Sequence, residues 1–312
     1  MTNLSIQSNV ASKKSCKNKK SMWLLVLIAP VLIYLFIFKY IPIVFAFSIS
    51  VRDYTFSGGV FGSEFVGLAN FKQLFASSEF YSVLQNTILL NVYLLIFSFP
   101  FPIFLAILLN EVNCMPFKRT VQSILYVPHF ISWIVLGGII ISILSPSIGV
   151  INNILKMFGM EPVFFMASEK YWPVVFVMSD MWQSAGWGTI IYLAAITGID
   201  PGIYEAGRID GANKFKQIIH ITLPSIGPTI AIMLILRTGR ILDTNFDQVY
   251  ALQNKAVLKV SDVVSTYEYR IGLEGARYSY TSALGLFKSV IGLIFITFTN
   301  KMANKFGGNG LW

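Results

Sequence analysis

The sequence contains little charge and few residues that bind metal ions. Only 12% of its 312 residues are Asp, Glu, Lys or Arg, whereas a soluble domain carries about 25%. The two cysteines, Cys16 and Cys114, are too few for a disulfide framework. The two histidines, His129 and His220, lie far apart, and none of these four residues shows metal-ligand spacing. We therefore expect no metal site and no catalytic site built from them.

A recognisable nucleotide site is also missing. No Gly-x-x-x-x-Gly-Lys-Ser/Thr phosphate-binding loop occurs, and the Gly-rich run at 307–310 lacks both the Lys and a preceding strand. We expect that the chain binds no cofactor and that any ATP is hydrolysed by another subunit. The net charge of +9 does not indicate nucleic-acid binding, because the basic residues flank apolar runs instead of alternating with aromatic residues on a polar face.

Apolar residues dominate what is present. They make up 55% of the chain, and the mean hydropathy is +0.65, so the composition predicts a polytopic, all-α integral membrane protein. Six apolar runs are near the roughly 20 residues that a helix needs to cross a bilayer. These runs cover residues 22–47, 83–109, 124–144, 173–197, 226–242 and 283–298.

The distribution of basic residues predicts the topology. Residues 1–21 are polar and rich in lysine, and the segment that follows is too long for the roughly 7–15-residue core of a signal peptide. Lys and Arg are enriched in cytoplasmic segments, and the segments on the side of this tail hold more of them than the longer opposite segments. We therefore expect both termini in the cytoplasm.

Four parts of the chain follow from this topology. They are a basic cytoplasmic tail at 1–21, a first transmembrane helix with an external segment at 22–80, a core at 81–301 with a cytoplasmic loop at 200–228, and a cytoplasmic C-terminal tail at 302–312.

The cytoplasmic loop is polar, yet it is neither Gly/Ser-rich nor repetitive. Asp200 can cap a helix that begins with Pro201, and we place Glu205 in the first turn, where a negative charge suits the positive helix end. Gly211 weakens the helix, and Pro224 is expected to stop the segment. The pattern predicts a short helix, a soft joint, and a second helix that leads to the next apolar run.

The same loop carries the pattern Glu-Ala-Gly at 205–207, Asp-Gly-Ala at 210–212, a Phe at 215, and Ile-Thr-Leu-Pro at 221–224 followed by Pro228. This pattern resembles the EAA loop in the membrane-spanning subunits of binding-protein-dependent ABC importers, although Gly207 stands where Ala is usual. An ordinary cytoplasmic loop of another polytopic protein is the alternative.

In that family the loop forms a coupling helix that docks on a cytoplasmic ATPase subunit. The resemblance implies that Glu205 and Arg208 contact the ATPase, that Asp210 holds the bend, and that Gly211 and Ala212 permit close backbone approach. The residues implied in coupling are Glu205, Ala206, Gly207, Arg208, Asp210, Gly211, Ala212 and Phe215.

Other segments are similar to the oligosaccharide and complex-carbohydrate permeases of this family. These segments lie at 67–75, 126–133, 246–249, 265–273 and 310–312. The resemblance implies the type I permease fold, a second homologous permease subunit, an external sugar-binding protein, and two ATPase subunits that bind ATP and Mg. It also implies a bacterial cell membrane as the location and an oligosaccharide as the substrate.

Polar residues within the predicted spans suggest a path for that substrate. Asp180, Trp182, Gln183 and Trp187 form a polar strip with aromatic rings, which suits stacking on sugars and hydrogen bonding to hydroxyl groups. The alternative is that Asp180 lies near the outer interface and the tryptophans belong to the aromatic belt.

Charged residues in the fifth and sixth spans leave further alternatives open. Arg237, Arg240 and Asp243 are spaced by three, which places them on one helix face. They either line a water-filled passage or form an internal ladder of ion pairs. Lys288 pairs with Asp180, pairs with Asp243, or extends to the interface.

Two other classes of function compete with an ABC importer. An ion-coupled secondary transporter would use Asp180, Arg237 and Arg240, and its uptake would depend on an ion gradient and not on ATP. A membrane-embedded enzyme would need clustered His or Asp pairs, whereas Asp180 and Asp243 are isolated in the sequence.

Overall fold

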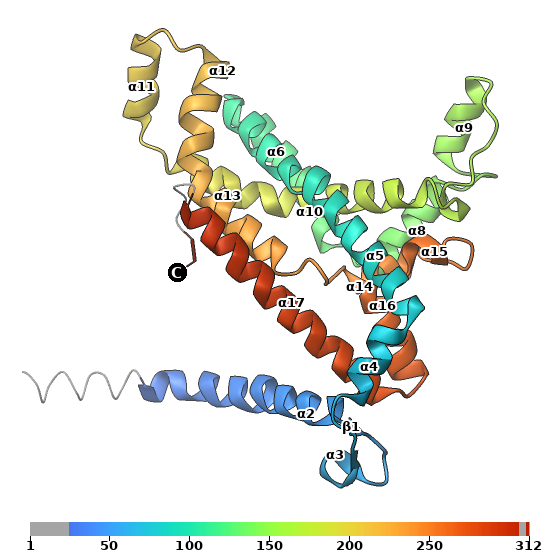
Figure 1. Ribbon diagram of the computed structural model, residues 1–312. Coiled ribbons are helices and arrows are strands. Elements are labelled where there is room, and N and C mark those ends of the chain that lie inside the picture. The colour runs from blue at the N-terminus through green and yellow to red at the C-terminus, as the bar shows by residue number, and fades with distance from the viewer. Residues whose placement is uncertain (1–24, 306–309, 312) are drawn as a thin grey trace, which may run out of the picture. The chain divides into compact units, whose positions relative to one another are not determined.

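The computed structural model describes residues 25–305 and 310–311, so the basic tail expected at 1–21 lies outside the described residues. The chain divides into two compact units. One unit contains Met1–Phe71 and Tyr278–Leu286, and the other contains Lys72–Arg277 and Phe287–Trp312. The described parts of both are largely helical (Figure 1).

The first unit begins with the helix Leu25–Ser50, which includes the π-helical turn η1 (Phe36–Tyr40) and α2 (Ile41–Ser50). No part of its most apolar stretch is buried by the described residues. After it, β1 (Arg52–Asp53) pairs antiparallel with β2 (Glu64–Phe65) around α3 (Gly59–Gly62). Asn70 closes this segment by donating hydrogen bonds to the carbonyls of Ser50 and Arg52 at 2.8 and 2.9 Å.

Short helices lead into the second unit. Most of the segment at 67–75 that resembles sugar permeases lies in α4 (Ala69–Ala76). The next helix contains α5 (Ser78–Tyr93), the π-helical turn η2 (Leu94–Ser98) and α6 (Pro100–Glu111). The remaining elements are α7 (Met115–Tyr126), η3 (Val127–Phe130), α8 (Trp133–Ile143), α9 (Val150–Met157), η4 (Phe165–Ala167), α10 (Trp172–Thr197), α11 (Pro201–Ile209), α12 (Lys214–Gln217), η5 (Ile218–Thr222), α13 (Leu223–Thr238), α14 (Phe246–Leu252), α15 (Leu258–Ser261), α16 (Val264–Glu268), η6 (Tyr269–Glu274) and α17 (Tyr278–Lys305).

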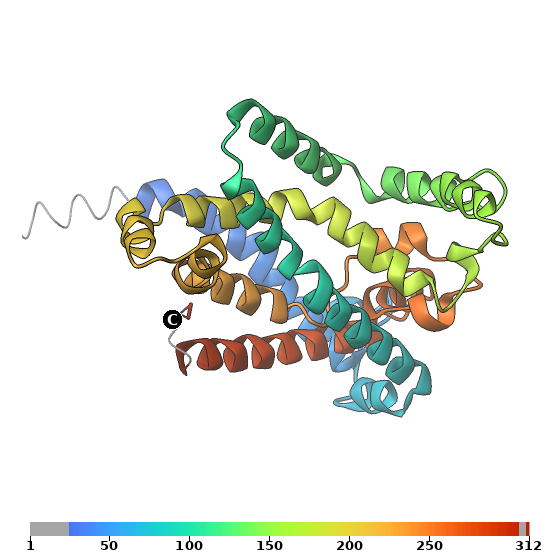
Figure 2. The same cartoon turned by 90° about the horizontal axis from the view of Figure 1, so that it is seen from above.

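The helix α10 organises the packing of the second unit. It makes its most extensive contact with α6 and also meets α7, η2 and α13, and α6 crosses it at an angle in Figures 1 and 2. Near its start, Trp172 and Phe176 are buried and stacked, and the Trp172 indole donates to the carbonyl of Leu252 at 2.9 Å. A second cluster, around Tyr192 and Ile226, packs the other half of α10 against α6 and α13.

Within the described residues, four helices are long and apolar enough to cross a membrane: Leu25–Ser50, Ser78–Glu111, Lys214–Thr238 and Tyr278–Lys305. A fifth span arises if Met115–Phe130 and Trp133–Ile143, which meet at a bend of 105°, form one broken span. The predicted run at 124–144 is therefore not one straight helix. The helix α10 has 26 residues but is not among these spans, because Asp180, Gln183 and two serines reduce its apolar character.

Candidate functional site

The helix α11 begins as the sequence predicts. Pro201 is its first residue, and the Asp200 carboxylate accepts a hydrogen bond from the Gly202 N–H at 2.9 Å. The placement of Glu205 is wrong, however, because Glu205 is the fifth residue of α11 and the first turn contains no acidic residue. Its exposed carboxylate is therefore free of any role at the helix end.

A backbone motif forms the joint after α11. Gly211 has a φ of +78°, and its N–H bonds to the carbonyl of Arg208 at 3.0 Å while the Ala212 N–H bonds to that of Gly207 at 2.8 Å. This is the Schellman ending, which favours glycine because other residues are strained at positive φ. No atom lies within 4 Å of a Cβ built at Gly211, so the backbone angle and not close approach requires the glycine.

The side chain of Asp210 has no hydrogen-bond partner within residues 25–305, so the carboxylate does not hold the bend as expected.

The glycine at position 207, where alanine is usual in the EAA pattern, has a packing explanation. A Cβ at this position would lie 2.8 Å from the Cδ1 atom of Ile221, which fills the space that an alanine methyl group would take.

The second helix of the loop does not stop at Pro224. The elements α12, η5 and α13 form one helix, Lys214–Thr238, which passes through both Pro224 and Pro228. The π turn η5 ends at Thr222, just before Pro224. A π turn leaves one backbone carbonyl without the N–H partner that it would have in an α-helix, so the N–H that proline lacks is not needed there and the proline costs little stability. The membrane span therefore continues without interruption into the loop.

Two contacts hold the loop together and a third fixes it to α6. The Tyr204 hydroxyl lies 2.9 Å from the hydroxyl of Thr222, and the Gln217 amide donates to the Ala212 carbonyl at 2.9 Å. The Lys214 ammonium forms an ion pair at 2.6 Å with Glu111, the last residue of α6. Sequence reasoning missed Glu111 because it lies 103 residues from its partner.

The outer surface of the loop exposes apolar side chains beside charged ones. Ile209 is 87% exposed and Phe215 70% exposed, and Glu205 and Arg208 are also exposed. Apolar residues that a structured loop leaves uncovered are typical of a protein-docking surface. The rigid joint at Gly211 holds these residues in a fixed arrangement.

The polar residues of the predicted fourth span include Asp180. Its carboxylate accepts a short hydrogen bond from the Ser98 hydroxyl on the π turn η2, and the opposite charge that acts on it is Arg237, near the end of α13. Asp180 is the ninth residue of α10, about 12 Å along the helix axis from its start. Arg237 therefore acts on Asp180 through its charge and not through an ion pair in the described residues, a proximity that the sequence spacing does not suggest.

An aromatic pair lies further along α10. The rings of His129 and Trp187 are stacked, with centroids 5.0 Å apart and planes inclined by 9°. The Gln183 amide donates to the His129 carbonyl at 3.4 Å. Trp182 and Trp187 are each about half exposed, at 46% and 51%. His129 lies on η3, at the break between α7 and α8, so the break brings its ring against α10.

The predicted ladder on the fifth helix is wrong. The helix α13 ends at Thr238, so Arg240 and Asp243 lie in the turn beyond it and share no helix face with Arg237. Asp243 pairs instead with Lys288 at 3.6 Å. Arg240 is exposed and has no ion-pair partner within the described part of the chain.

The more buried partner of Lys288 is Glu268, 2.9 Å away, with side-chain exposures of 19% and 25%. Burial raises the pKa of the Glu268 carboxyl, and Lys288 offsets part of that rise. A second cluster links Arg270 to Asp262 at 2.5 Å and to Glu79 at 3.0 Å. The pairing of Lys288 with Asp243 was one of the predicted alternatives and is confirmed. The partner Glu268 and the Arg270 cluster were missed, because they join residues from separate elements.

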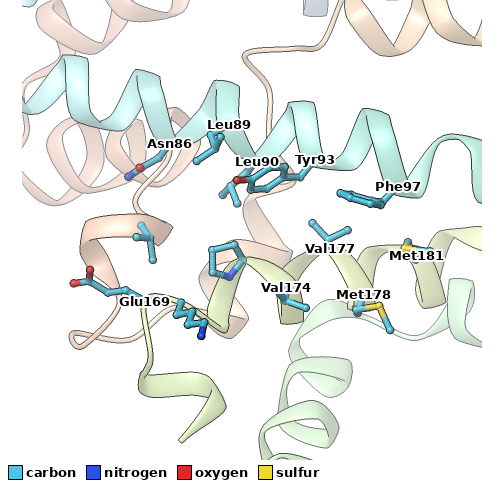
Figure 3. Close-up of a pocket in the computed structure, with 13 residues that line it drawn as sticks. Asn86, Leu89, Leu90, Tyr93, Phe97, Glu169, Val174, Val177, Met178 and Met181 are labelled. Atoms are coloured by element: carbon cyan, nitrogen blue, oxygen red, sulfur yellow. The ribbon is translucent and has the colours of Figure 1, made fainter.

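A cavity of about 610 Å³ lies between α5–η2 and α10 (Figure 3). Its walls are aliphatic and aromatic, and its polar residues are Asn86, Glu169 and Lys170. Such a lining offers few partners for sugar hydroxyls, whose burial without hydrogen bonds is costly. None of the predicted path residues at 180, 182, 183 and 187 lines it.

Comparison with known proteins identifies the family. The model of the binding-protein-dependent transport system inner membrane component matches residues 115–306. The chain belongs to this family. It is 41% identical over 290 residues to the polygalacturonan/rhamnogalacturonan transport system permease protein YteP of Bacillus subtilis, with 93% of this chain and 90% of that protein covered. It is 30% identical to the arabinooligosaccharides transport system permease protein AraP of Bacillus subtilis, with 90% and 88% covered.

A solved structure of a family member has the same fold. One chain of a bacterial alginate ABC transporter, crystallised with a periplasmic protein that holds an alginate pentasaccharide, superposes with a TM-score of 0.87 at 37% identity. The match covers 95% of this chain and 99% of that chain. As an inner membrane component of binding-protein-dependent transport, the chain is a membrane protein of an ABC system.

Proposed function

We propose that this chain is the transmembrane permease subunit of an ATP-driven ABC importer that takes up an oligosaccharide delivered by an external binding protein. The observation that carries the proposal is the 41% identity to a polygalacturonan/rhamnogalacturonan permease along 93% of the chain. The alginate transporter supports it, because its permease chain shares the fold and its complex contains a sugar-loaded periplasmic protein.

The proposed subunit has six spans, with α10 as the sixth and both termini in the cytoplasm of a bacterial cell. At 26 residues α10 is about 39 Å long, enough for a hydrocarbon core of about 30 Å. Its polar residues contact Ser98 and the η3 segment, and polar groups that face the protein are tolerated in membranes.

The complete importer contains a second homologous permease and two ATPase subunits that bind ATP and Mg. This chain is not catalytic in our proposal, since its sequence has no phosphate-binding loop. The residues proposed to dock on the ATPase are those exposed around the Gly211 joint, namely Glu205, Arg208, Ile209 and Phe215.

Coupling in this proposal uses the continuity of the second helix. Closure of the ATPases on ATP pulls the loop of each permease, and the helix Lys214–Thr238 carries that displacement from the loop to Arg237. The cavity between the two permeases then changes from inward- to outward-facing, receives the sugar, and releases it inward on reset. The ion pair between Lys214 and Glu111 links the loop to the end of α6.

The substrate path in this proposal follows α10 and the turn after α13. Trp182, Trp187 and the ring of His129 offer stacking faces for sugar rings, while Gln183 and Asp180 offer hydrogen bonds. Two of the similar proteins are named for the transport of acidic polysaccharides, polygalacturonan in one case and alginate in the other. Arg240 is exposed and has no ion-pair partner in the described residues, so we assign it to a uronate carboxylate and infer an acidic oligosaccharide as substrate.

The test is uptake by the complex with its partner subunits, purified from native membranes and reconstituted into vesicles. We expect uptake of a labelled acidic oligosaccharide to require internal ATP and the binding protein, and to be insensitive to collapse of ion gradients. Glu205→Lys should lower uptake and sugar-stimulated ATP hydrolysis together, because it reverses an exposed charge on the docking surface while the helix end is unaffected.

A matched control is Glu161→Lys, which reverses an exposed charge in the segment between α9 and η4, on the opposite side of the predicted membrane. It should leave both activities near the wild-type values. Uptake that depends on an ion gradient without ATP would establish a secondary transporter instead. Wild-type coupling in Glu205→Lys would remove this part of the loop from the docking surface.

A further inference from the structure

The segment between α8 and α10 forms a hairpin, residues 145–164, that projects from the second unit. Its helix α9 runs crosswise to α10, and it lies at the end of α10 remote from α11 (Figure 1). In the view from above, α9 is seen nearly end-on beyond α8 (Figure 2). Because α8 ends the broken span at Ile143, the α9 hairpin follows the membrane boundary within a few residues.

The α9 hairpin is rigidly built around one buried amide. The side chain of Asn152 donates to the carbonyls of Leu144, Ser145 and Val163 at 3.0, 3.2 and 3.1 Å, and its Oδ1 accepts from the Val163 N–H at 2.7 Å. Asn152 is fully buried. These hydrogen bonds connect α9 to the segments before and after it, so both arms of the hairpin are held in place. The face that α9 turns outward is therefore fixed.

The face of α9 opposite Asn152 is apolar and uncovered. Val150, Ile154, Met157 and Phe158 recur at the spacing of one helix face, and their exposures are 59%, 44%, 86% and 79%. Lys156 lies on the other side of the helix. In water this arrangement would expose an apolar patch on a segment whose own packing is complete, which indicates that something covers it.

We infer that the α9 hairpin rests on the outer membrane surface with this apolar face in the boundary between lipid headgroups and acyl chains. Three observations favour lipid as the occupant. The hairpin follows directly from a membrane span, its helix lies across the direction of α10, and its cation at Lys156 lies on the polar side opposite the apolar face, as in helices that bind membrane surfaces.

The size of α9 argues against a protein partner as the main occupant. A helix of eight residues is about 12 Å long, so one face of it offers far less than the roughly 800 Å² that each partner buries in a stable protein interface. A lipid surface needs no such area, since each apolar side chain that enters the boundary adds independently. The inference requires that the chain spans a membrane but not that it carries sugar.

The inference can be tested by the depth of single labels in the complex with its partner subunits, reconstituted in phosphatidylethanolamine–phosphatidylglycerol vesicles. In a Cys16→Ser/Cys114→Ser background, Ile154→Cys places a fluorophore on the apolar face and Lys156→Cys places one on the polar side. We expect brominated acyl chains to quench the label at 154 at least threefold more than the label at 156. Iodide in the water should show the opposite order.

Two outcomes would overturn the inference. Equal quenching of both labels by iodide would place the hairpin in water, and protection of the 154 label from both quenchers would mean that a protein covers it. A label at Met157 in the Ile154→Glu/Phe158→Glu variant provides a further check. These charges on the apolar face should release the label from lipid quenching, while ATP-dependent uptake reports independently whether the transporter is intact.

Discussion

The two polar segments at the ends of α13 are held in shape in different ways. Before α13, the loop at 200–222 depends on contacts between near neighbours: the cap at Asp200, the turn at Gly211, and the cap at Asn213, whose side chain accepts from the Lys216 N–H at 2.9 Å. After it, the segment at 239–277 depends on ion pairs between distant residues, such as Arg270 with Glu79, 191 residues away.

This difference determines how each segment responds to mutation. A local turn is lost when a substituted residue cannot adopt the backbone angle that the turn requires, and the rest of the fold remains. A long-range ion pair fails when one charge is removed, and the cost depends on how much of the partner is buried. The two segments therefore predict different phenotypes, loss of coupling before α13 and loss of stability after it.

The largest effect is expected at Lys288. Lys288→Met leaves the carboxylate of Glu268, only 25% exposed, without its ion pair. Removing one partner of a buried pair typically costs about 3–5 kcal/mol, and for this partly exposed pair we expect about 2–3 kcal/mol, measured by denaturation of the purified complex. The double variant Lys288→Met/Glu268→Gln should recover much of the loss.

The control for this experiment is Lys259→Met. Lys259 pairs with Glu169 at 3.7 Å, but the two side chains are 81% and 47% exposed, and surface pairs contribute about 0–1 kcal/mol. Equal losses in the two variants would mean that the burial of the Lys288 pair does not govern its contribution.

A smaller effect on stability but a clear effect on activity is expected at Gly211. Gly211→Val forces a β-branched residue to a φ of +78°, at a cost of about 1–3 kcal/mol. The turn should relax and misplace Phe215, so uptake and sugar-stimulated ATP hydrolysis should both fall about tenfold. Binding of the external sugar-binding protein should be unchanged.

Gly227→Ala is the matched control for the turn. Gly227 lies within α13, has no atom within 4 Å of the position that a Cβ would take, and does not have positive φ. Alanine is a better helix former than glycine, so activity should stay near wild type. If both glycine variants lose activity alike, the conformation of Gly211 is not what the coupling requires.

The next effect, at Arg240, concerns the substrate. Arg240→Gln should raise the KM for an acidic oligosaccharide about three- to tenfold without changing the KM for a neutral one, because only the acidic sugar offers a carboxylate. Complex assembly should be unaffected, since no ion pair in the described residues is lost. Lys255→Gln, at an exposed position in the same segment, is the control. Equal shifts for both sugars would contradict the assignment.

The smallest effect is expected at the ion pair of Lys214 with Glu111. The distance is short at 2.6 Å, but the side chains are 64% and 35% exposed, so Glu111→Gln should change stability by about 0.5 kcal/mol or less. The change should vanish at 1 M salt, where screening acts within about 3 Å. A salt-independent loss would mean that Glu111 has a different role.

Much of the helical fold was predictable, because each apolar run is ended by proline, glycine or polar residues. The cap at Asp200 and the joint at Gly211 were also found, since both use local chemistry that residue types reveal. The predictions failed where helix boundaries mattered. Glu205 was placed one turn too early, and α13 ends at Thr238 instead of continuing to 242, which removed the basis for the ladder.

Other features leave no local signal in the sequence. The π turn at η5 lets the helix pass Pro224, and no residue preference announces it. The stack of His129 on Trp187 joins residues 58 positions apart through the break after η3. The influence of the Arg237 charge on Asp180 likewise depends on how α10 packs against α13. Such contacts follow from tertiary packing, which periodicity and capping rules do not describe.

The continuity of Lys214–Thr238 has a thermodynamic consequence. A helix of 25 residues is a rod about 37 Å long, with Phe215, one of the proposed docking residues, at one end and Arg237 at the other. Both ends belong to one element, so nucleotide binding that tilts the rod also changes the affinity of the transporter for sugar. Sugar binding must then change the affinity for nucleotide by the same factor. Titrating nucleotide with and without sugar, and sugar with and without nucleotide, should therefore yield one coupling constant.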